Sequence, residues 1–287
     1  GGTLINLPLN YIFIYGKLGV PAMGGIGCGW ATSISNGVAA LAMFLYLNRS
    51  AAYRQFHLLQ DWVKPDPETI KTILRLGVPI GFTIFIEASM FCIIALFLAP
   101  LGPVTVAGHQ IALNVVSLFF MVPLSLGLAL TLRISFLVGA RATDTAQLLA
   151  RTILLLALAI ALVFGSVLFF GSNLIAHLYT GDEAVQEVSR ALLLYAAIFQ
   201  IADVTQVTCI SALRGYKDTR IPMFIMLFSF WGVGLPLGWI LAFTDRIVPV
   251  MGAAGFWVGL TVGLTVAGLL LGARLYRFPA THPDVAP

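Results

Sequence analysis

Residues 77–132 decide the fold, and they read GVPIGFTIFIEASMFCIIALFLAPLGPVTVAGHQIALNVVSLFFMVPLSLGLALTL. Glu87 and His109 are the only ionisable residues in this stretch. A helix crosses a bilayer in about 20 residues, so the stretch is too long for one crossing. Pro100-Leu101-Gly102-Pro103 lies near its middle and disfavours a continuous helix. We therefore expect two membrane-spanning helices joined at this break.

Long uncharged segments recur along the rest of the chain. Of its 287 residues, 59% are apolar and 10% are charged, whereas a soluble domain usually carries about a quarter charged residues. This composition excludes a soluble single-core protein and predicts an all-α, polytopic membrane protein. We expect a partial span ending near Tyr15 and seven complete spans at about residues 24–47, 70–99, 104–132, 148–177, 188–213, 221–243 and 252–275.

The charged residues cluster between these spans and predict the orientation. The 16 Lys and Arg against 12 Asp and Glu form no basic patch of the kind that binds phosphate backbones, so we expect no nucleic-acid partner. Only Lys17, Arg190 and Arg246 lie on one side of the predicted membrane, and the other Lys and Arg residues lie on the opposite side. The positive-inside rule therefore predicts that the C-terminus is cytoplasmic.

The sequence contains an internal repeat. A shift of 228 residues aligns Leu7-Pro8-Leu9 with Leu235-Pro236-Leu237, and Val20-Pro21 with Val248-Pro249, without a gap. This period contains six predicted helices. Because six is an even number, equivalent helices run in the same direction, which is typical of a parallel six-helix repeat.

The repeat predicts the domain organisation. Residues 1–48 would be the last helix and a half of an N-terminal six-helix lobe, and residues 49–68 a cytoplasmic linker between lobes. Residues 69–287 would be a C-terminal six-helix lobe with a short cytoplasmic tail. A complete first repeat would need about 160 more residues upstream, so we expect the N-terminus to be a cut.

Two acidic residues lie inside predicted spans. An ionised carboxylate near the middle of a bilayer costs several kcal/mol, so Glu87 and Asp203 are candidate functional residues. A site that binds a proton, a metal ion and an organic cation in turn requires carboxyl groups inside the membrane. The alternative is that each acid is protonated and only hydrogen-bonds a neighbouring helix.

Polar residues accompany both acids at helical spacing. Gln200 and Gln206 share the face of Asp203, together with Phe199. His109 and Gln110 begin a stripe that continues to Asn114 and Ser117. This pattern predicts supporting residues of a water-lined cavity, or else ordinary hydrogen bonds between helices.

Small residues and prolines also recur within the spans. Gly252, Gly255, Gly259 and Gly263 favour close packing of helices. Pro236 lies inside a predicted span, where it removes a backbone hydrogen bond.

No motif indicates an enzyme. The sequence contains no HExxH, GxSxG, GxxxxGK[ST] or CxxC pattern, which argues against a zinc peptidase, a serine hydrolase and an ATP-driven motor. Cys28, Cys92 and Cys209 lie in apolar segments at spacings that suggest neither a disulfide framework nor a metal site. We expect no cofactor, and an ion gradient as the energy source.

Five motifs in the same order carry a family resemblance. They are LPLNYIFIYG (7–16), GGIGCG (24–29), GHQIALN (108–114), MVPLSLG (121–127) and LRGYKD (213–218). Together they resemble the multidrug and toxic-compound extrusion (MATE) family, in its NorM-like bacterial branch. The resemblance covers the whole chain, from the family's fifth helix to its twelfth.

The resemblance implies a twelve-helix antiporter that expels organic cations from bacteria across the inner membrane in exchange for H+ or Na+. It places Glu87 and Asp203 at the cation site of the C-terminal lobe, where Na+ would bind if it is the coupling ion. The family often has a tyrosine where this chain has Phe199, and loss of that hydroxyl favours protons. The partners implied are small organic cations, the coupling cation and membrane lipids, with a monomer when full length.

Two other functions fit parts of the sequence. A lipid-linked precursor flippase of the same superfamily would be expected to have basic residues inside its spans for a pyrophosphate, and the predicted span cores contain no Lys or Arg. A non-transporting remnant would account for the missing first repeat.

Overall fold

The computed structural model describes residues 2–17, 19, 21–50, 65–246 and 248–281, without the side chains of residues 2, 3 and 278–281. It divides into two compact units, Gly1–Pro67 and Glu68–Pro287. The predicted linker lies largely in residues 51–64, outside the described residues.

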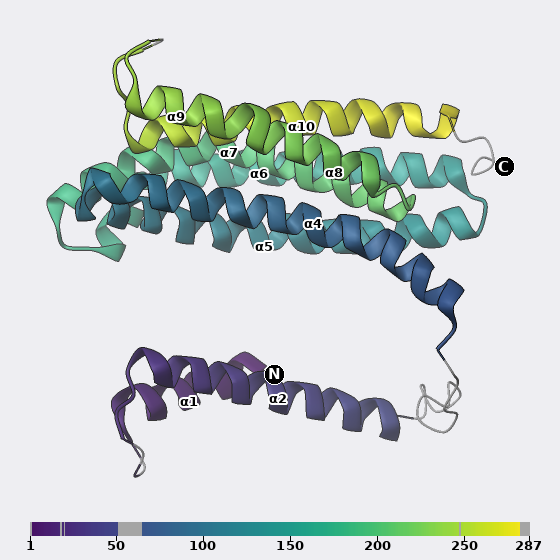
Figure 1. Cartoon of the computed structure of the whole chain (residues 1–287), viewed down its shortest axis with the longest axis horizontal. Helices are drawn as coiled ribbons and strands as arrows, with labels where there is room; N and C mark the ends of the chain where they lie inside the picture. Colours follow the sequence, from purple (N-terminus) through teal and green to yellow (C-terminus); the bar gives the residue numbers. More distant parts are fainter. Residues whose placement is uncertain (1, 18, 20, 51–64, 247, 282–287) are drawn as a thin grey trace. The chain divides into compact units, whose positions relative to one another are not determined.

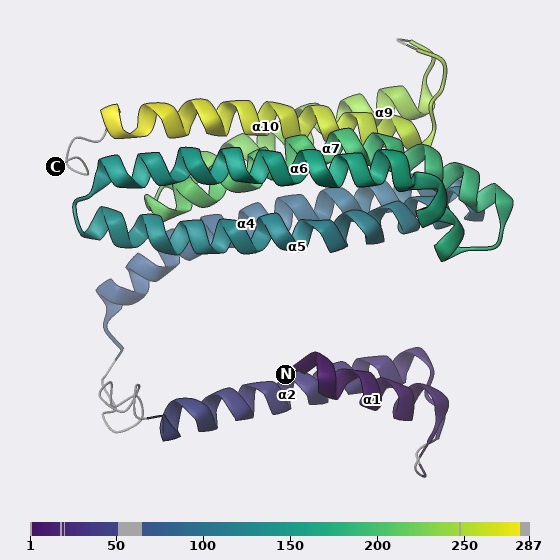
Figure 2. The same cartoon turned by 180° about the vertical axis from the view of Figure 1, so that it is seen from behind.

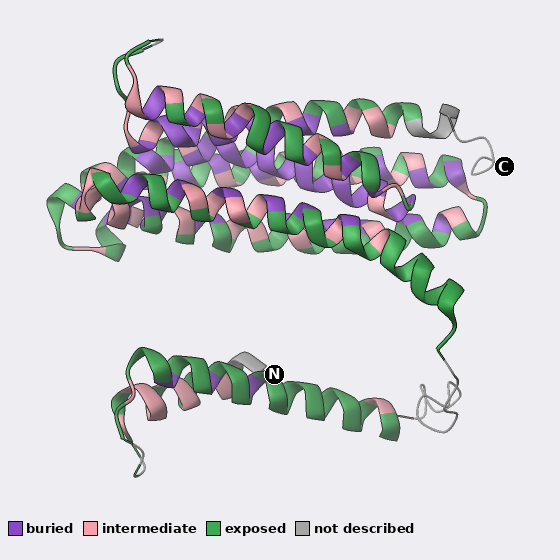
Figure 3. Ribbon diagram, in the orientation of Figure 1, coloured by how far each residue is buried: buried purple, intermediate pink, exposed green. Residues whose placement is uncertain are grey.

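The first unit is a helical hairpin. Helix α1 (Gly2–Tyr15) packs against α2 (Gly25–Arg49), as Figure 1 shows for this unit. A Cβ at Gly27 would lie 2.7 Å from the Phe13 carbonyl oxygen, so the contact requires a glycine. Most of α2 is exposed, as Figure 3 shows.

The second unit begins with a helix that ends where the sequence predicts. Helix α4 spans Pro67–Leu98, and a short 3-10 turn, Ala99–Leu101, follows it. Gly102 has a φ of 95°, which a glycine adopts without strain, and α5 begins at Pro103. The break at residues 100–103 is therefore confirmed.

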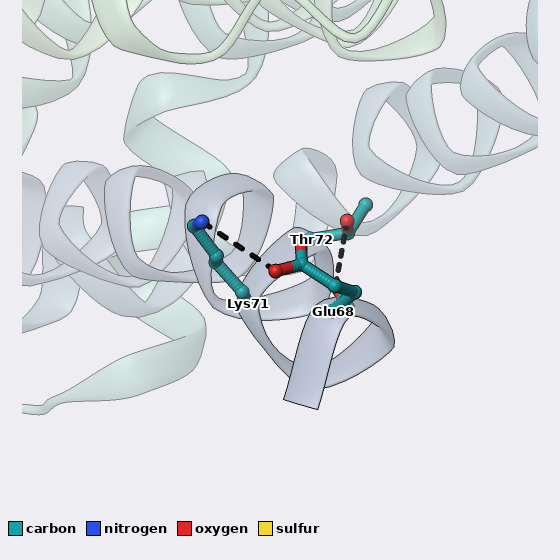
Figure 4. Close-up of polar contacts among 3 residues, drawn as sticks. All are labelled: Glu68, Lys71 and Thr72. Atoms are coloured by element: carbon teal, nitrogen blue, oxygen red, sulfur yellow. Dashed lines mark hydrogen bonds and ion pairs between the residues drawn. The ribbon is translucent and has the colours of Figure 1, made fainter. Parts of the chain in front are cut away.

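The first turn of α4 is held by local polar contacts. The Thr72 hydroxyl donates to the Glu68 carbonyl oxygen at 2.9 Å, and Lys71 Nζ lies 3.7 Å from Glu68 Oε1 (Figure 4). Both charged side chains are largely exposed, so this ion pair adds little stability.

The remaining helices form a bundle around α7. The helices are α5 (Pro103–Gly139), α6 (Thr143–Tyr179), α7 (Glu183–Gly215) and α10 (Ala253–Thr281). Helix α7 contacts α5, α6 and α10, and Figures 1 and 2 show it inside the bundle from both sides. The outer faces carry exposed apolar side chains such as Leu132, Phe170 and Leu178, as expected for contact with lipid.

One predicted span contains three helical segments. Helix α8 (Arg220–Leu227) continues into a π-helical segment (Phe228–Gly234) and then into α9 (Leu235–Phe243). Pro236 has no N–H to donate back to the preceding turn, which is consistent with wider turns just before it.

The π-helical segment and α9 pack closely on α10. A Cβ at Gly259 would lie 2.5 Å from the Gly234 carbonyl oxygen and 2.5 Å from Gly238 Cα. The prediction that these glycines serve helix packing is confirmed at Gly255, Gly259 and Gly263, which all make such contacts.

Seven helical segments among the described residues are long and apolar enough to cross a membrane. The α1 segment Leu4–Tyr15 is a shorter apolar helix. The predicted all-α fold with seven complete spans and a partial one is therefore confirmed.

Candidate functional site

The second unit contains a cavity of about 420 Å³ between α4, α5 and α7. Polar and aromatic side chains from all three helices face it together with small and aliphatic residues. The cavity is lined by Glu87, Ala88, Phe91, Gln110, Leu113, Asn114, Val116, Ser117, Phe120, Phe199 and Asp203.

The two predicted acids lie on this cavity from different helices. Glu87 is half-buried on α4, whereas Asp203 on α7 is 3% exposed. Both carboxyl groups line the same cavity, although they come from different helices. The cavity is therefore an acidic site inside an otherwise apolar lobe.

One oxygen of Asp203 is buried without a protein partner. Asp203 Oδ2 accepts no hydrogen bond from any residue that the structure describes. A buried carboxylate oxygen is costly unless a proton, a cation or a hydrogen-bond donor satisfies it. Asp203 is thus suited to bind a proton or a cation.

Helix α5 supplies the neutral polar part of the wall. Gln110, Asn114 and Ser117 recur every three or four residues and therefore share one face of the helix. The sequence predicted this stripe, and all three residues lie on the cavity. Their side chains can donate and accept hydrogen bonds without adding charge.

Three aromatic rings contribute to the apolar part of the wall. Phe199 comes from α7, Phe91 from α4 and Phe120 from α5. The Phe199 ring packs edge-to-face on Trp257 of α10, with ring centroids 5.5 Å apart. Aromatic faces attract cations, so the same wall can contact a flat organic cation.

Three predicted supporting residues do not line the cavity. His109 is buried, and its Nδ1 accepts a hydrogen bond of 3.2 Å from Trp257 Nε1. Gln206 Nε2 donates to Met226 Sδ at 3.2 Å. Gln200 is fully buried, and neither of its amide atoms has a partner among the described residues.

Sequence reasoning missed Phe120 and Trp257. Phe120 lies three residues after Ser117 and shares its face of α5, but it is apolar, and an extension of the polar stripe by four residues leads to Met121 instead. Trp257 lies far away in the sequence, on α10, and no local pattern connects it to Phe199 or His109.

Comparison with known proteins finds a family match. The MatE family model matches residues 79–240. The chain is 45% identical over 276 residues to the probable multidrug resistance protein NorM of Idiomarina loihiensis, covering 96% of this chain and 60% of that protein. It is 43% identical over 277 residues to the multidrug resistance protein PmpM of Pseudomonas aeruginosa, covering 96% and 58%.

Solved structures have the same fold. A eukaryotic MATE transporter, AtDTX14, matches with a TM-score of 0.84 at 21% identity, covering 96% of this chain and 60% of that chain. An outward-facing multidrug resistance MATE family transporter matches with a TM-score of 0.84 at 18% identity, covering 99% and 61%. The chain thus spans about 60% of the length of these relatives, which fits a C-terminal portion.

Proposed function

The chain belongs to the MatE family of multidrug and toxic-compound extrusion transporters, and we propose that it is part of a secondary-active antiporter that exports organic cations in exchange for H+ or Na+. Its apolar helices and its bacterial relatives support a multi-pass protein of the inner membrane. The alternative functions, a flippase and a non-transporting remnant, become outcomes of the test below.

The observation that carries the proposal is that Glu87 and Asp203, 116 positions apart in the sequence, line one cavity. Two carboxylates in an apolar lobe attract cations, and two cations cannot occupy the same oxygens. A bound drug therefore excludes the coupling ion from Asp203 and Glu87, and the ion excludes the drug. Such exclusive occupancy is what couples the two fluxes in an antiporter.

The cavity walls fit an organic cation. Its volume of about 420 Å³ falls within the range of about 300–1,000 Å³ for small-molecule sites. Phe91, Phe120 and Phe199 supply flat apolar contacts, and Gln110 and Asn114 supply hydrogen bonds. Apolar walls with few polar groups impose little geometric selection, which suits binding of several drugs.

The side chain of Phe199 favours H+ as the coupling ion. A sodium ion needs several oxygen ligands, as hard cations generally do, and Phe199 contributes none at the position where the family often has a tyrosine. A proton needs only one carboxylate oxygen, and Asp203 Oδ2 is buried without a partner among the described residues.

We further propose the predicted lobes and orientation. Residues 1–48 and 69–287 would belong to two lobes joined by a linker at 49–68, with the C-terminus in the cytoplasm and the complete protein a monomer. The unequal distribution of Lys and Arg between the loops supports this orientation.

Ethidium efflux from proteoliposomes tests the proposal. Because the relatives are longer, the assay uses a chain that also includes the N-terminal portion found in them. A sodium gradient and a pH gradient are imposed separately on the wild type, Glu87→Gln and Asp203→Asn. The matched control is Glu68→Gln, because Glu68 is exposed at the start of α4, outside the cavity.

We expect one gradient to drive efflux, Glu87→Gln and Asp203→Asn each to abolish it, and Glu68→Gln to leave it unchanged. The effective gradient then identifies the coupling ion. If the wild type exports no cation under either gradient, the antiporter proposal fails, and a flippase or a non-transporting remnant becomes the better explanation.

A further inference from the structure

The second unit contains another cavity, of about 150 Å³, between α6, α7 and α10. Gln147 and Arg151 on α6, Cys209 on α7, and Gly272 and Tyr276 on α10 are among its lining residues. It shares no lining residue with the cavity of Glu87 and Asp203. The antiport proposal therefore does not account for it.

Arg151 gives this cavity a hydrogen-bonding cation. Its guanidinium lies 6.0 Å from the ring centroid of Tyr276, and no described carboxylate forms an ion pair with it. Gln147 lies one helical turn earlier on the same face of α6, and its amide makes no hydrogen bond with the described residues. Arginine binds phosphate oxygens through two parallel N–H groups, and an amide can donate a further bond.

The floor of the cavity leaves room for a ligand group. Apart from its own helix, the only described atom within 4 Å of a Cβ at Gly272 would be Cys209 Sγ, at 3.9 Å. The glycine is therefore not needed for helix packing, and its missing side chain leaves space beside Cys209.

The electrostatic field at this end of the unit favours an anion. Here α5, α7 and α10 end and α4, α6 and α8 begin, as Figures 1 and 2 show. The described Lys and Arg residues at these helix ends outnumber the described acids of this unit there, Glu68, Asp144 and Asp218, and Asp218 is already bonded to Arg274 Nε at 2.8 Å. The cations at these helix ends include Arg141, Lys217, Arg220, Arg274 and Arg277. A cluster of one sign attracts the opposite charge.

Exposed apolar side chains lie beside the cavity. Leu148 and Leu155 are three residues before and four residues after Arg151, so they share its face of α6. They are 66% and 69% exposed, and Tyr276 is 77% exposed. A ligand that places its phosphate near Arg151 can therefore run an alkyl chain along these residues.

We propose that this cavity binds the phosphate group of an anionic phospholipid, with Arg151 and Gln147 as donors and the acyl chains along α6. Basic pockets between helices at the end of a membrane bundle bind lipid head groups in this way. Free phosphate shares the same head-group chemistry, but it makes no use of the apolar flank at Leu148 and Leu155.

Lipid binding to the purified protein in detergent tests the proposal, independently of transport. Native mass spectrometry compares phosphatidylglycerol with phosphatidylcholine, and inorganic phosphate is titrated separately. Arg151→Gln removes the cation, and because Arg151 is exposed this substitution does not open the core. Gly272→Leu fills the floor without changing charge. The matched control is Arg133→Gln, because Arg133 also lies over an aromatic ring, Phe136, but outside the cavity.

We expect the wild type to prefer phosphatidylglycerol, and Arg151→Gln to weaken its binding about fivefold. Gly272→Leu should also weaken binding, whereas Arg133→Gln should not. Equal binding by the wild type and Arg151→Gln, or an equal loss in Arg133→Gln, would overturn the proposal. Arg151-dependent binding of inorganic phosphate without a preference for phosphatidylglycerol would overturn the lipid as its source.

Discussion

The contact between α9 and α10 should not tolerate even one added methyl group. We consider Gly259→Ala, whose Cβ would lie 2.5 Å from both the Gly234 carbonyl oxygen and Gly238 Cα. Carbon atoms in ordinary contact are about 3.5–4.0 Å apart, so the helix backbones must separate by about 1 Å. Neither neighbour is a flexible side chain that could rotate away. Overpacking of this kind typically costs about 1–3 kcal/mol.

The matched control is Gly272→Ala on the same helix. Among the described residues outside its own helix, only Cys209 Sγ would lie within 4 Å of this Cβ, and its distance of 3.9 Å is ordinary contact. Both substitutions replace a glycine of α10 by alanine, so the gain in helix propensity cancels in the comparison. The free energy of unfolding, measured by denaturation of the purified protein in detergent, should be about 1–3 kcal/mol lower for Gly259→Ala than for Gly272→Ala. Equal values would refute the close contact.

Two further predictions concern Phe199, which lines the cavity, and Trp257, which packs on it. Trp257→Phe removes the N–H that donates to His109 Nδ1; the buried imidazole nitrogen then loses its partner, so the free energy of unfolding should fall by about 1–3 kcal/mol. Trp239→Phe, at a half-exposed tryptophan, should change it much less, and a similar loss in both variants would contradict the assignment. Phe199→Tyr places a hydroxyl on the cavity wall near Asp203, so sodium-driven ethidium efflux should increase relative to the wild type. An unchanged response to sodium would count against the role of this position in ion choice.

The spans could be predicted from sequence, because long uncharged segments have no other stable environment. Their ends were less predictable. The span predicted at residues 104–132 continues as helix to Gly139, since Arg133 ends the apolar segment but is itself a good helix former. The π-helical segment was not predicted, because Pro236 indicates a missing hydrogen bond but not the form of the turns before it.

Glu87 and Asp203 could be identified as candidates because an ionised carboxylate inside a span is costly. Their spacing in the sequence did not show that they line one cavity. Glu87 and Asp203 share a cavity only because the fold brings α4, α5 and α7 around it. The sequence pattern groups His109 with Gln110, yet consecutive residues of a helix point about 100° apart. Gln110 therefore faces the cavity, whereas His109 faces Trp257.

The π-helical segment helps to keep one stripe of buried residues on the same side of the span formed by α8, the segment itself and α9. Buried residues recur at every fourth position through α8, the π-helical segment and α9: Pro222, Met226, Phe230, Gly234, Gly238 and Ala242. With 3.6 residues per turn, each four-residue step would rotate the stripe by about 40°, and the whole set by more than half a turn. The wider turns of residues 228–234 rotate less per residue and offset part of this drift. Deleting one residue there would therefore rotate α8 about its axis relative to α9. Met226 would turn away from Gln206, although the composition of the span would remain almost unchanged.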